Sequence, residues 1–326
     1  MRKVLKYIFV GLALIILLLI FYINLFWDKE FNAPYPDITA SKDSAVIAHG
    51  SYLVYGAAHC AYCHVPSEKI SEVAAGKKIP LIGGGEFDIP PGIFRTPNLT
   101  PDIETGIGKL SDKEIARSLR YLVNHNNKFM VPFMAYQNIS DDDLIAIISF
   151  LRSQKPEVHK VPQNEYRFLG KALLAFGILK PTGPTKPITK SVDRDTTVEY
   201  GNYLANSVAN CVGCHTNRDM KTGEMIGEPF AGGFTIEAEP FAVLQQGYKY
   251  VTPNLTPDKE TGILASWSEK DFIRRMKGGR IYEGSPMPWE AFSTINEVDM
   301  KAIFKYLKSL PPVKNKVEKI AIEPEQ

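Results

Sequence analysis

Two cysteine pairs, each followed at once by a histidine, are the residues of this chain best suited to chemistry. They read Cys60-Ala-Tyr-Cys63-His64 and Cys211-Val-Gly-Cys214-His215, and they account for all 4 cysteines. Two thiols about one helical turn apart can bond to the two vinyl groups of a porphyrin, and the histidine that follows can ligate its iron. The spacing therefore predicts two covalently attached haem c groups, with His64 and His215 as iron ligands.

Other uses of a cysteine pair explain these motifs less well. A disulfide, one zinc site built from both pairs, or a thioredoxin-type redox pair would each account for the thiols. None of them requires a histidine directly after both pairs, and no strand-helix-strand pattern surrounds either motif. The haem interpretation is therefore favoured.

The motifs lie in a segment that the chain contains twice. "TPNLTPDIETGIG" begins at Thr96 and "TPNLTPDKETGIL" begins at Thr252, and 11 of their 13 letters agree. The stretches around the cysteines, "GSYL" and "GNYL", and the last helical segments also correspond. A long repeat indicates one structural unit present twice. We call residues 43–158 the first copy and residues 194–312 the second copy.

Each copy is expected to be mostly helical, which predicts an all-α protein. Four segments have a capping residue three positions before an acid, the usual start of a helix, and long apolar runs with helical spacing follow the last cap of each copy. No run alternates with the period of a strand. The four pairs are Ser111 with Glu114, Ser140 with Asp143, Ser268 with Asp271, and Asn296 with Asp299.

The N-terminus predicts a single transmembrane helix. Residues 1–6 contain three positive charges, and residues 7–27 contain no charged residue. About 20 apolar residues span a bilayer core, and the bulky residues at the end of the run do not form a cleavage site for a signal peptidase. The positive-inside rule leaves residues 1–6 in the cytoplasm and the body on the periplasmic side of the inner membrane.

Two further segments complete the predicted domain organisation. Residues 159–193 are expected to form a linker, in which 168–179 could be a short helix packed between the copies. Residues 313–326 are expected to be a loose, charged tail.

Both copies resemble class I cytochrome c domains. The order Gly-x-Tyr-Leu, Cys-x-x-Cys-His, "PNLTPD", a capped helix, a methionine and a final capped helix is similar to that of the cytochrome subunits of membrane-bound alcohol and gluconate dehydrogenases. The resemblance implies that the carbonyls of Pro97 and Pro253 accept a hydrogen bond from His64 and His215. Those subunits have three haem motifs, whereas this chain has two.

The sixth iron ligand is expected to be a methionine in each copy. Met287 lies between two prolines, nine residues before the cap at Asn296, where such cytochromes place this ligand. In the first copy, the sequence around Met134 resembles the ligand loop of related cytochromes. Met130 is the alternative there, and His125 is a more remote one.

These features predict an electron-transfer protein. The net charge of +2 and the lack of a basic run interleaved with aromatics give no sign of a nucleic-acid partner. No catalytic triad, paired carboxylates or phosphate-binding loop accompanies the haem motifs, so no enzymatic activity is expected. The expected partners are redox proteins: a membrane dehydrogenase, an oxidase or a soluble cytochrome. A dihaem peroxidase is the alternative function, and a passive structural role is a third.

Overall fold

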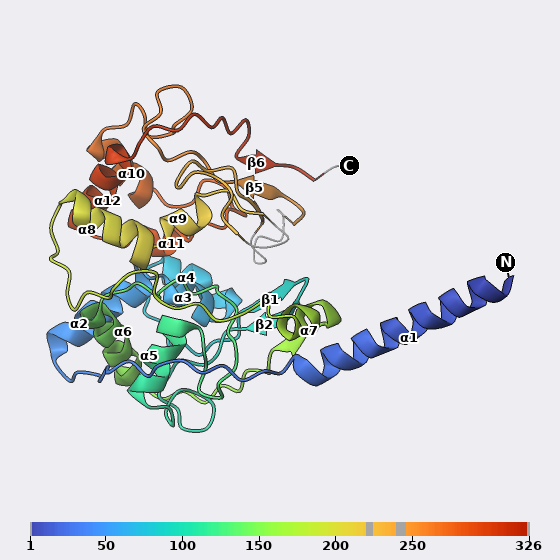
Figure 1. The fold of residues 1–326 in the computed structure, drawn as a ribbon. Coiled ribbons are helices and arrows are strands. Elements are labelled where there is room, and N and C mark those ends of the chain that lie inside the picture. Colours follow the sequence, from blue (N-terminus) through green and yellow to red (C-terminus); the bar gives the residue numbers. More distant parts are fainter. Residues whose placement is uncertain (1, 220–223, 239–245, 325–326) are drawn as a thin grey trace.

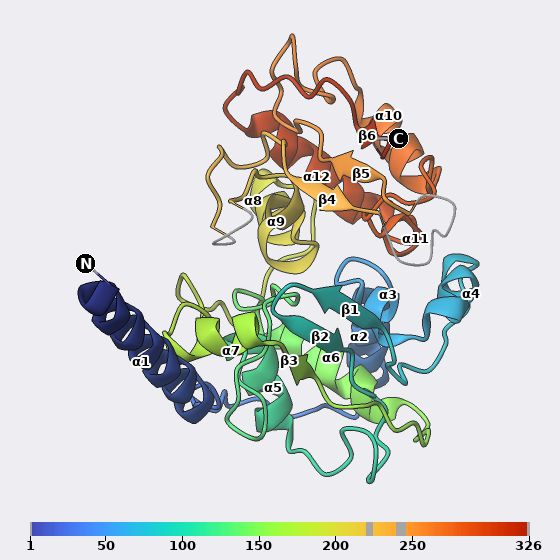
Figure 2. The same cartoon turned by 90° about the vertical axis from the view of Figure 1, so that its right-hand side faces the viewer.

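One long helix projects from a body built of two similar halves. The computed structural model describes residues 2–219, 224–238 and 246–324. Helix α1 (Arg2–Phe26) extends away from the body, and the second copy lies against one side of the first (Figures 1 and 2). Within the described residues, α1 is the only helix long and apolar enough to cross a membrane. It begins five residues before the predicted apolar span and ends one residue before the end of that span.

The first copy and the segment after it contain six helices of α type, a short 3-10 turn and three strands. In chain order the elements are α2 (Ser44–Tyr55), α3 (Cys60–His64), the 3-10 turn Ser67–Lys69, α4 (Ile70–Ala74), β1 (Glu86–Ile89), β2 (Gly92–Arg95), α5 (Asp112–Tyr121), α6 (Asp141–Ser153), β3 (Glu165–Tyr166) and α7 (Phe168–Ala175).

The second copy repeats this order with small changes. Its elements are α8 (Val198–Tyr203), a π-helical turn Leu204–Val208, α9 (Cys211–Cys214), β4 (Thr235–Glu237), β5 (Lys249–Val251), α10 (Glu269–Lys277), α11 (Trp289–Phe292), α12 (Glu297–Ser309) and β6 (Ala321–Ile322).

All four predicted helix starts are confirmed. Ser111 and Ser268 form complete capping boxes with Glu114 and Asp271, in which each side chain bonds the backbone N–H of the other residue. Ser140 and Asn296 also cap their helices through the side chain. The acids of this second pair of caps instead accept hydrogen bonds from tyrosines of the other copy.

The first and last helices of each copy cross very closely, and a glycine allows this. A Cβ atom added to Gly50 in α2 would lie 1.8 Å from the Ala146 carbonyl oxygen of α6. A Cβ on Gly201 in α8 would lie 1.9 Å from the Ala302 carbonyl oxygen of α12. The glycine of the repeated Gly-x-Tyr-Leu motif therefore sets the distance between the two helices in both copies.

The prediction of an all-α protein is wrong in one respect, because each copy also has a small sheet. β2 pairs antiparallel with β1 and β3, and β5 pairs antiparallel with β4 and β6. The strands are two to four residues long. Such strands are too short to produce an alternating pattern in the sequence.

The predicted boundaries of the copies also need correction. β3 lies beyond residue 158 and β6 lies beyond residue 312, and each completes the sheet of its copy. The segment expected to be a loose tail is thus held by strand pairing at Ala321 and Ile322. The short helix of the linker does form, as α7, but it contacts α1 and does not pack between the copies.

The buried side chains of both copies form one continuous cluster, which includes Leu53, Ile148, Leu204 and Ile303. Helix α11 of the second copy contacts α4 of the first, next to α3 (Figure 1). The two Cys-x-x-Cys-His segments are therefore held in a single packed body.

Candidate functional site

Both Cys-x-x-Cys-His motifs lie on short helices, α3 and α9. The residue before each first cysteine, His59 or Asn210, adopts a left-handed backbone conformation with φ of 40° or 51°. This turn ends the preceding segment and begins a new helix at the cysteine. The same local backbone is therefore built twice from different residues.

The four cysteine sulfurs are not joined as disulfides. Burial raises the pKa of Cys60 and of Cys211 to about 12 in each case. In the part of the chain that the structure describes, no three His, Cys, Asp or Glu side chains form a group able to hold a metal ion. Among the described residues the two pairs are therefore not gathered into one such group.

The two motif histidines have the same environment. His64 Nδ1 lies 3.0 Å from the carbonyl oxygen of Pro97, and His215 Nδ1 lies 3.0 Å from that of Pro253. A carbonyl oxygen can only accept, so Nδ1 carries the proton and Nε2 keeps its lone pair. Burial lowers the pKa of His64 to about 4 and also lowers the pKa of His215. Both rings are thus neutral at pH 7, the form in which histidine binds a metal.

Two glycines that the sequence analysis did not single out allow each proline loop to lie close to the histidine of its copy. Gly83 and Gly232 have φ of 74° and 73°, and their N–H groups donate to the carbonyls of His64 and His215. A Cβ at either position would lie 2.4 Å from the carbonyl oxygen of the threonine before the proline. Comparing "IGGG" with "AGGF" in the two copies could have found them.

The repeated "TPNLTPD" loop is fixed by its asparagine. The Asn98 side chain accepts from the Thr100 N–H and donates to the Glu157 carbonyl. Asn254 accepts from the Thr256 N–H and donates to the Val313 carbonyl. The loop is thereby fastened to the chain that follows the last helix of its copy, and this holds the proline carbonyl in place.

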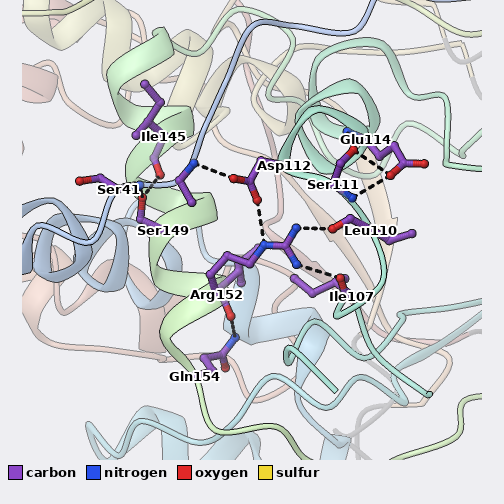
Figure 3. A network of polar contacts seen from close by, with 12 residues as sticks. Ser41, Ile107, Leu110, Ser111, Asp112, Glu114, Ile145, Ser149, Arg152 and Gln154 are labelled. Carbon is purple, nitrogen blue, oxygen red and sulfur yellow. Dashed lines mark hydrogen bonds and ion pairs between the residues drawn. The ribbon is translucent and has the colours of Figure 1, made fainter. Parts of the chain in front are cut away.

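A cation in the last turn of the final helix holds the rest of this loop. Arg152 pairs with Asp112 at 2.8 Å and donates to the carbonyls of Ile107 and Leu110 (Figure 3). In the second copy, Lys308 donates to the corresponding loop at the carbonyls of Leu264 and Ala265. In both copies a cation of the final helix thus donates to backbone carbonyls of this loop, although the residue type and the carbonyls differ.

The candidate methionines differ in their surroundings. Met134 and Met287 are half-buried and pack against the hydrophobic cluster that contains the motif helices. Met130 is also half-buried, but its backbone N–H pairs with the Leu122 carbonyl, and it is not among the residues packed on that cluster. His125 is exposed. The packing favours Met134 over the two alternatives.

The Met134 loop is tied directly to the first cysteine motif. The Tyr136 hydroxyl donates to the carbonyl of Ala58, two residues before Cys60, and the Tyr136 ring is buried. Burial raises the pKa of Tyr136, and the Cys60 thiol beside it acts in the same direction. The second copy has Trp289 at this place, whose ring stacks under the Arg275 guanidinium at 3.6 Å.

The three histidines that remain are half-buried. His49 bonds Asp143 at 2.6 Å, and the His59 ring packs edge-on against Phe292 of the second copy at 5.4 Å. His159 is half-buried. These residues serve packing and hydrogen bonding between the elements.

The residues of each copy fit a covalently bound haem. Two cysteines that are not disulfide-bonded precede a neutral histidine whose Nε2 is available, and a half-buried methionine packs on the same cluster. The backbone carbonyl behind the histidine is the kind of outer contact that fixes a metal-ligating imidazole.

Comparison with known proteins supports this interpretation. Residues 48–155 match the model of the cytochrome c family. The chain is 30% identical over 291 residues to the cytochrome c subunit of the quinone alcohol dehydrogenase of Gluconobacter oxydans. That match covers 83% of this chain and 56% of the relative. The resemblance expected from the motifs is confirmed.

Two other relatives agree with it. A subunit of the nicotinate dehydrogenase of Pseudomonas putida is 26% identical over 288 residues, which are 87% of this chain and 23% of the relative. A dihaem cytochrome c of Cereibacter sphaeroides is 24% identical over 276 residues, which are 80% of this chain and 84% of the relative. The chain thus spans about a quarter of the nicotinate dehydrogenase subunit, just over half of the alcohol dehydrogenase subunit, and most of the dihaem cytochrome.

Proposed function

We propose that this chain is a membrane-anchored dihaem cytochrome c that transfers electrons and has no catalytic site of its own. It would consist of two tandem class I cytochrome c domains after one transmembrane helix. The domain boundaries are those of the two copies, extended to Tyr166 and Ile322 because the third strand of each sheet lies there.

Each copy would hold one haem through the same four positions. The cysteines, Cys60 and Cys63 in the first copy and Cys211 and Cys214 in the second, would form the thioether bonds. His64 and His215 would be the proximal ligands, and Met134 and Met287 the distal ones. When bound, each haem supplies a one-electron Fe(III)/Fe(II) couple.

The observation that carries the proposal is the pair of equal contacts between histidine and proline. Both contacts measure 3.0 Å, and both orient a neutral, buried imidazole. A chance turn would not place a carbonyl at the same nitrogen in both copies and then fix it with the same asparagine and glycine. Support of this kind orients an imidazole and raises its basicity as a ligand.

The proposed location is the periplasmic side of the inner membrane. The positive charges of residues 1–6 would keep that end of α1 in the cytoplasm, and the body would follow on the other side. The relatives include subunits of dehydrogenases named for nicotinate and alcohol. We therefore propose a dehydrogenase as the electron donor, with an oxidase or a soluble cytochrome as the acceptor.

A redox titration of the haem-loaded full chain in detergent tests this function. We expect two reversible one-electron transitions, each with the absorption band of a methionine–iron bond at the red end of the visible spectrum. Met134→Ala and Met287→Ala should each remove one such band, whereas the matched control Met130→Ala should keep both.

Two results would contradict the proposal. Loss of a band in Met130→Ala but not in Met134→Ala would identify Met130, not Met134, as the distal ligand of the first copy. A haem of low potential that lacks the band and reacts with peroxide would indicate a dihaem peroxidase instead of an electron carrier.

A further inference from the structure

Helix α7 lies against the end of α1 that enters the body (Figures 1 and 2). The Phe176 ring stacks on Tyr22 of α1 at 5.5 Å between centroids, and Ile23 of α1 is fully buried. The Lys29 ammonium donates a 2.6 Å hydrogen bond to the Ala175 carbonyl, at the last residue of α7. These contacts fix α7 beside α1 rather than beside the second copy.

The position of Phe176 along α1 determines its depth if α1 crosses a membrane. Phe176 and four residues of α1, namely Ile15, Leu18, Leu19 and Tyr22, line one shallow apolar groove. At about 1.5 Å per residue, these four lie roughly 6 to 16 Å before the end of α1 at Phe26.

The length of the uncharged span of α1 places this groove inside the bilayer and not in water. The span covers residues 7–26, which are 20 residues and roughly 30 Å of helix. The hydrocarbon core of a bilayer is about 30 Å thick. The whole span is therefore needed to cross the core, and Phe176 must lie at or below the level of the headgroups.

The segment from 168 to 179 has the composition that such a place requires. Phe168, Leu169, Phe176 and Ile178 are large and apolar, yet between 47% and 60% of each is exposed. Lys171 is on the same helix, and its nitrogen lies 4.9 Å from the centroid of the Trp27 ring. An apolar surface with lysine and aromatic residues beside it is typical of helices that lie in the headgroup–acyl boundary, about 5 to 10 Å deep.

We propose that residues 168–179 form a second membrane contact, inserted in the periplasmic leaflet beside the exit of α1. The proposal rests on the proposed function in one respect, that α1 spans the membrane. The occupant of this apolar surface is lipid, because the surface is continuous with the lipid-facing side of α1. The first copy would then be held at the bilayer surface in one orientation and would not swing on a flexible tether.

Single-cysteine variants of the haem-loaded full chain in phospholipid nanodiscs test this. The native cysteines are consumed by haem attachment, so the unmodified chain gives the baseline. Phe176→Cys and Ile178→Cys report on the segment, Leu12→Cys reports on α1, and Val158→Cys is the water-exposed control, with Val158 77% exposed. The reagent is a membrane-impermeant maleimide, which reacts with thiolates in water.

We expect Phe176→Cys, Ile178→Cys and Leu12→Cys to react at least about tenfold more slowly than Val158→Cys, because a thiol in lipid does not ionise. A nanodisc phospholipid with a photoreactive acyl chain should also form adducts within 168–179 but not around Val158. This second measurement separates contact with lipid from shielding by α1.

The outcomes distinguish the two proposals. If Leu12→Cys is slow but Phe176→Cys and Ile178→Cys react as fast as Val158→Cys, the second contact is refuted and the anchor remains. Slow reaction at 176 and 178 without lipid adducts also refutes it. If Leu12→Cys reacts fast, the anchor fails and this inference fails with it.

Discussion

The Tyr203 hydroxyl donates a 2.6 Å hydrogen bond to Asp143 Oδ2, from the first helix of the second copy to the last helix of the first. The exchange is reciprocal, since the Tyr52 hydroxyl of the first copy donates to Asp299 Oδ2 of the second, also at 2.6 Å. The same two motif positions thus join the copies twice, in an approximately two-fold arrangement.

Each of these tyrosines also takes over one part of a helix cap. The Ser140 N–H donates to the Tyr203 hydroxyl at 3.0 Å, and the Asn296 N–H donates to the Tyr52 hydroxyl at 3.2 Å. In a capping box the acid at the third helical position would accept this N–H. Here that acid, Asp143 or Asp299, accepts from tyrosine, so the caps of α6 and α12 are completed by the other copy.

Removing these hydroxyls should weaken the joint between the copies. We expect Tyr203→Phe to reduce the free energy of unfolding by about 1.5 to 3 kcal/mol, the usual range for a hydrogen bond to a charged group. Tyr52→Phe should have a similar effect. Chemical denaturation measures both, and the double variant Tyr52→Phe/Tyr203→Phe should unfold in two separate transitions. A Tyr203→Phe/Asp143→Asn cycle with additive energies would show that the bond does not couple the copies.

Stability should fall in acid partly through Asp143. Burial pushes the pKa of Asp143 up, but hydrogen bonds from His49 and Tyr203 outweigh it and hold the pKa below its usual range. An acid whose pKa is lowered by folding stabilises the folded state at pH values above its unfolded pKa of about 4. This stabilisation is lost as the pH falls through the pKa of the folded state.

The comparison of two neighbouring acids checks this. Asp143→Asn should be less stable near neutral pH and should lose less stability between about pH 4 and pH 2. Asp142→Asn removes an exposed acid from the same helical turn. Its free energy of unfolding should change with pH as steeply as that of the unmodified chain. If the free energy of unfolding changes equally steeply with pH in both variants, Asp143 is not the source of the loss of stability in acid.

The helix crossings should not tolerate a side chain at the motif glycine. Gly201→Ala would put a Cβ 1.9 Å from the Ala302 carbonyl oxygen, which belongs to a helix backbone and cannot turn aside. Overpacking of this kind costs about 1 to 3 kcal/mol or more, and Gly50→Ala should behave alike. Thermal unfolding measures the loss. Gly11→Ala, at a helical glycine with nothing within 4 Å, is the control and should leave the midpoint unchanged.

Local chemistry made much of this protein predictable from sequence. Each helix cap depends on residues three positions apart, and all four predicted caps are confirmed. The repeat also pointed to Pro97 and Pro253 as partners of the histidines, through the family resemblance. The sheets were missed because a two-residue strand such as Glu165–Tyr166 leaves no period to detect.

The joint between the copies could not be predicted from either copy alone. Comparing the copies matches Tyr52 with Tyr203 and Asp143 with Asp299, but it does not say that each tyrosine bonds the acid of the other copy. That pairing depends on how the two bodies meet. For the same reason the sequence predicts α7 between the copies, whereas in the structure it contacts α1.

Arg280 connects the two candidate haem sites. Its Nη2 donates to the Tyr62 hydroxyl at 2.9 Å, within the first cysteine motif, and to the Met287 carbonyl at 3.3 Å. It also pairs with Glu290 at 2.7 Å, and both side chains are mostly buried. A positive charge here should favour the less positive Fe(II) state of a nearby haem.

Charge-changing variants should therefore shift a reduction potential. We expect Arg280→Met to lower the potential of the haem in the second copy, on the order of tens of millivolts, and Glu290→Gln to raise it. The double variant should return close to the unmodified value. Potentiometric titration measures this. If both single variants lower stability and leave the potentials unchanged, the pair is only structural.

The most direct test of the whole account is the number of covalent haems per chain, measured from denatured protein by the pyridine haemochrome spectrum against protein concentration. We predict two haems for the unmodified chain. Cys60→Ala/Cys63→Ala should leave the single haem of the second copy, and Cys211→Ala/Cys214→Ala that of the first. One haem or none in the unmodified chain would contradict the claim that both copies are haem-binding domains.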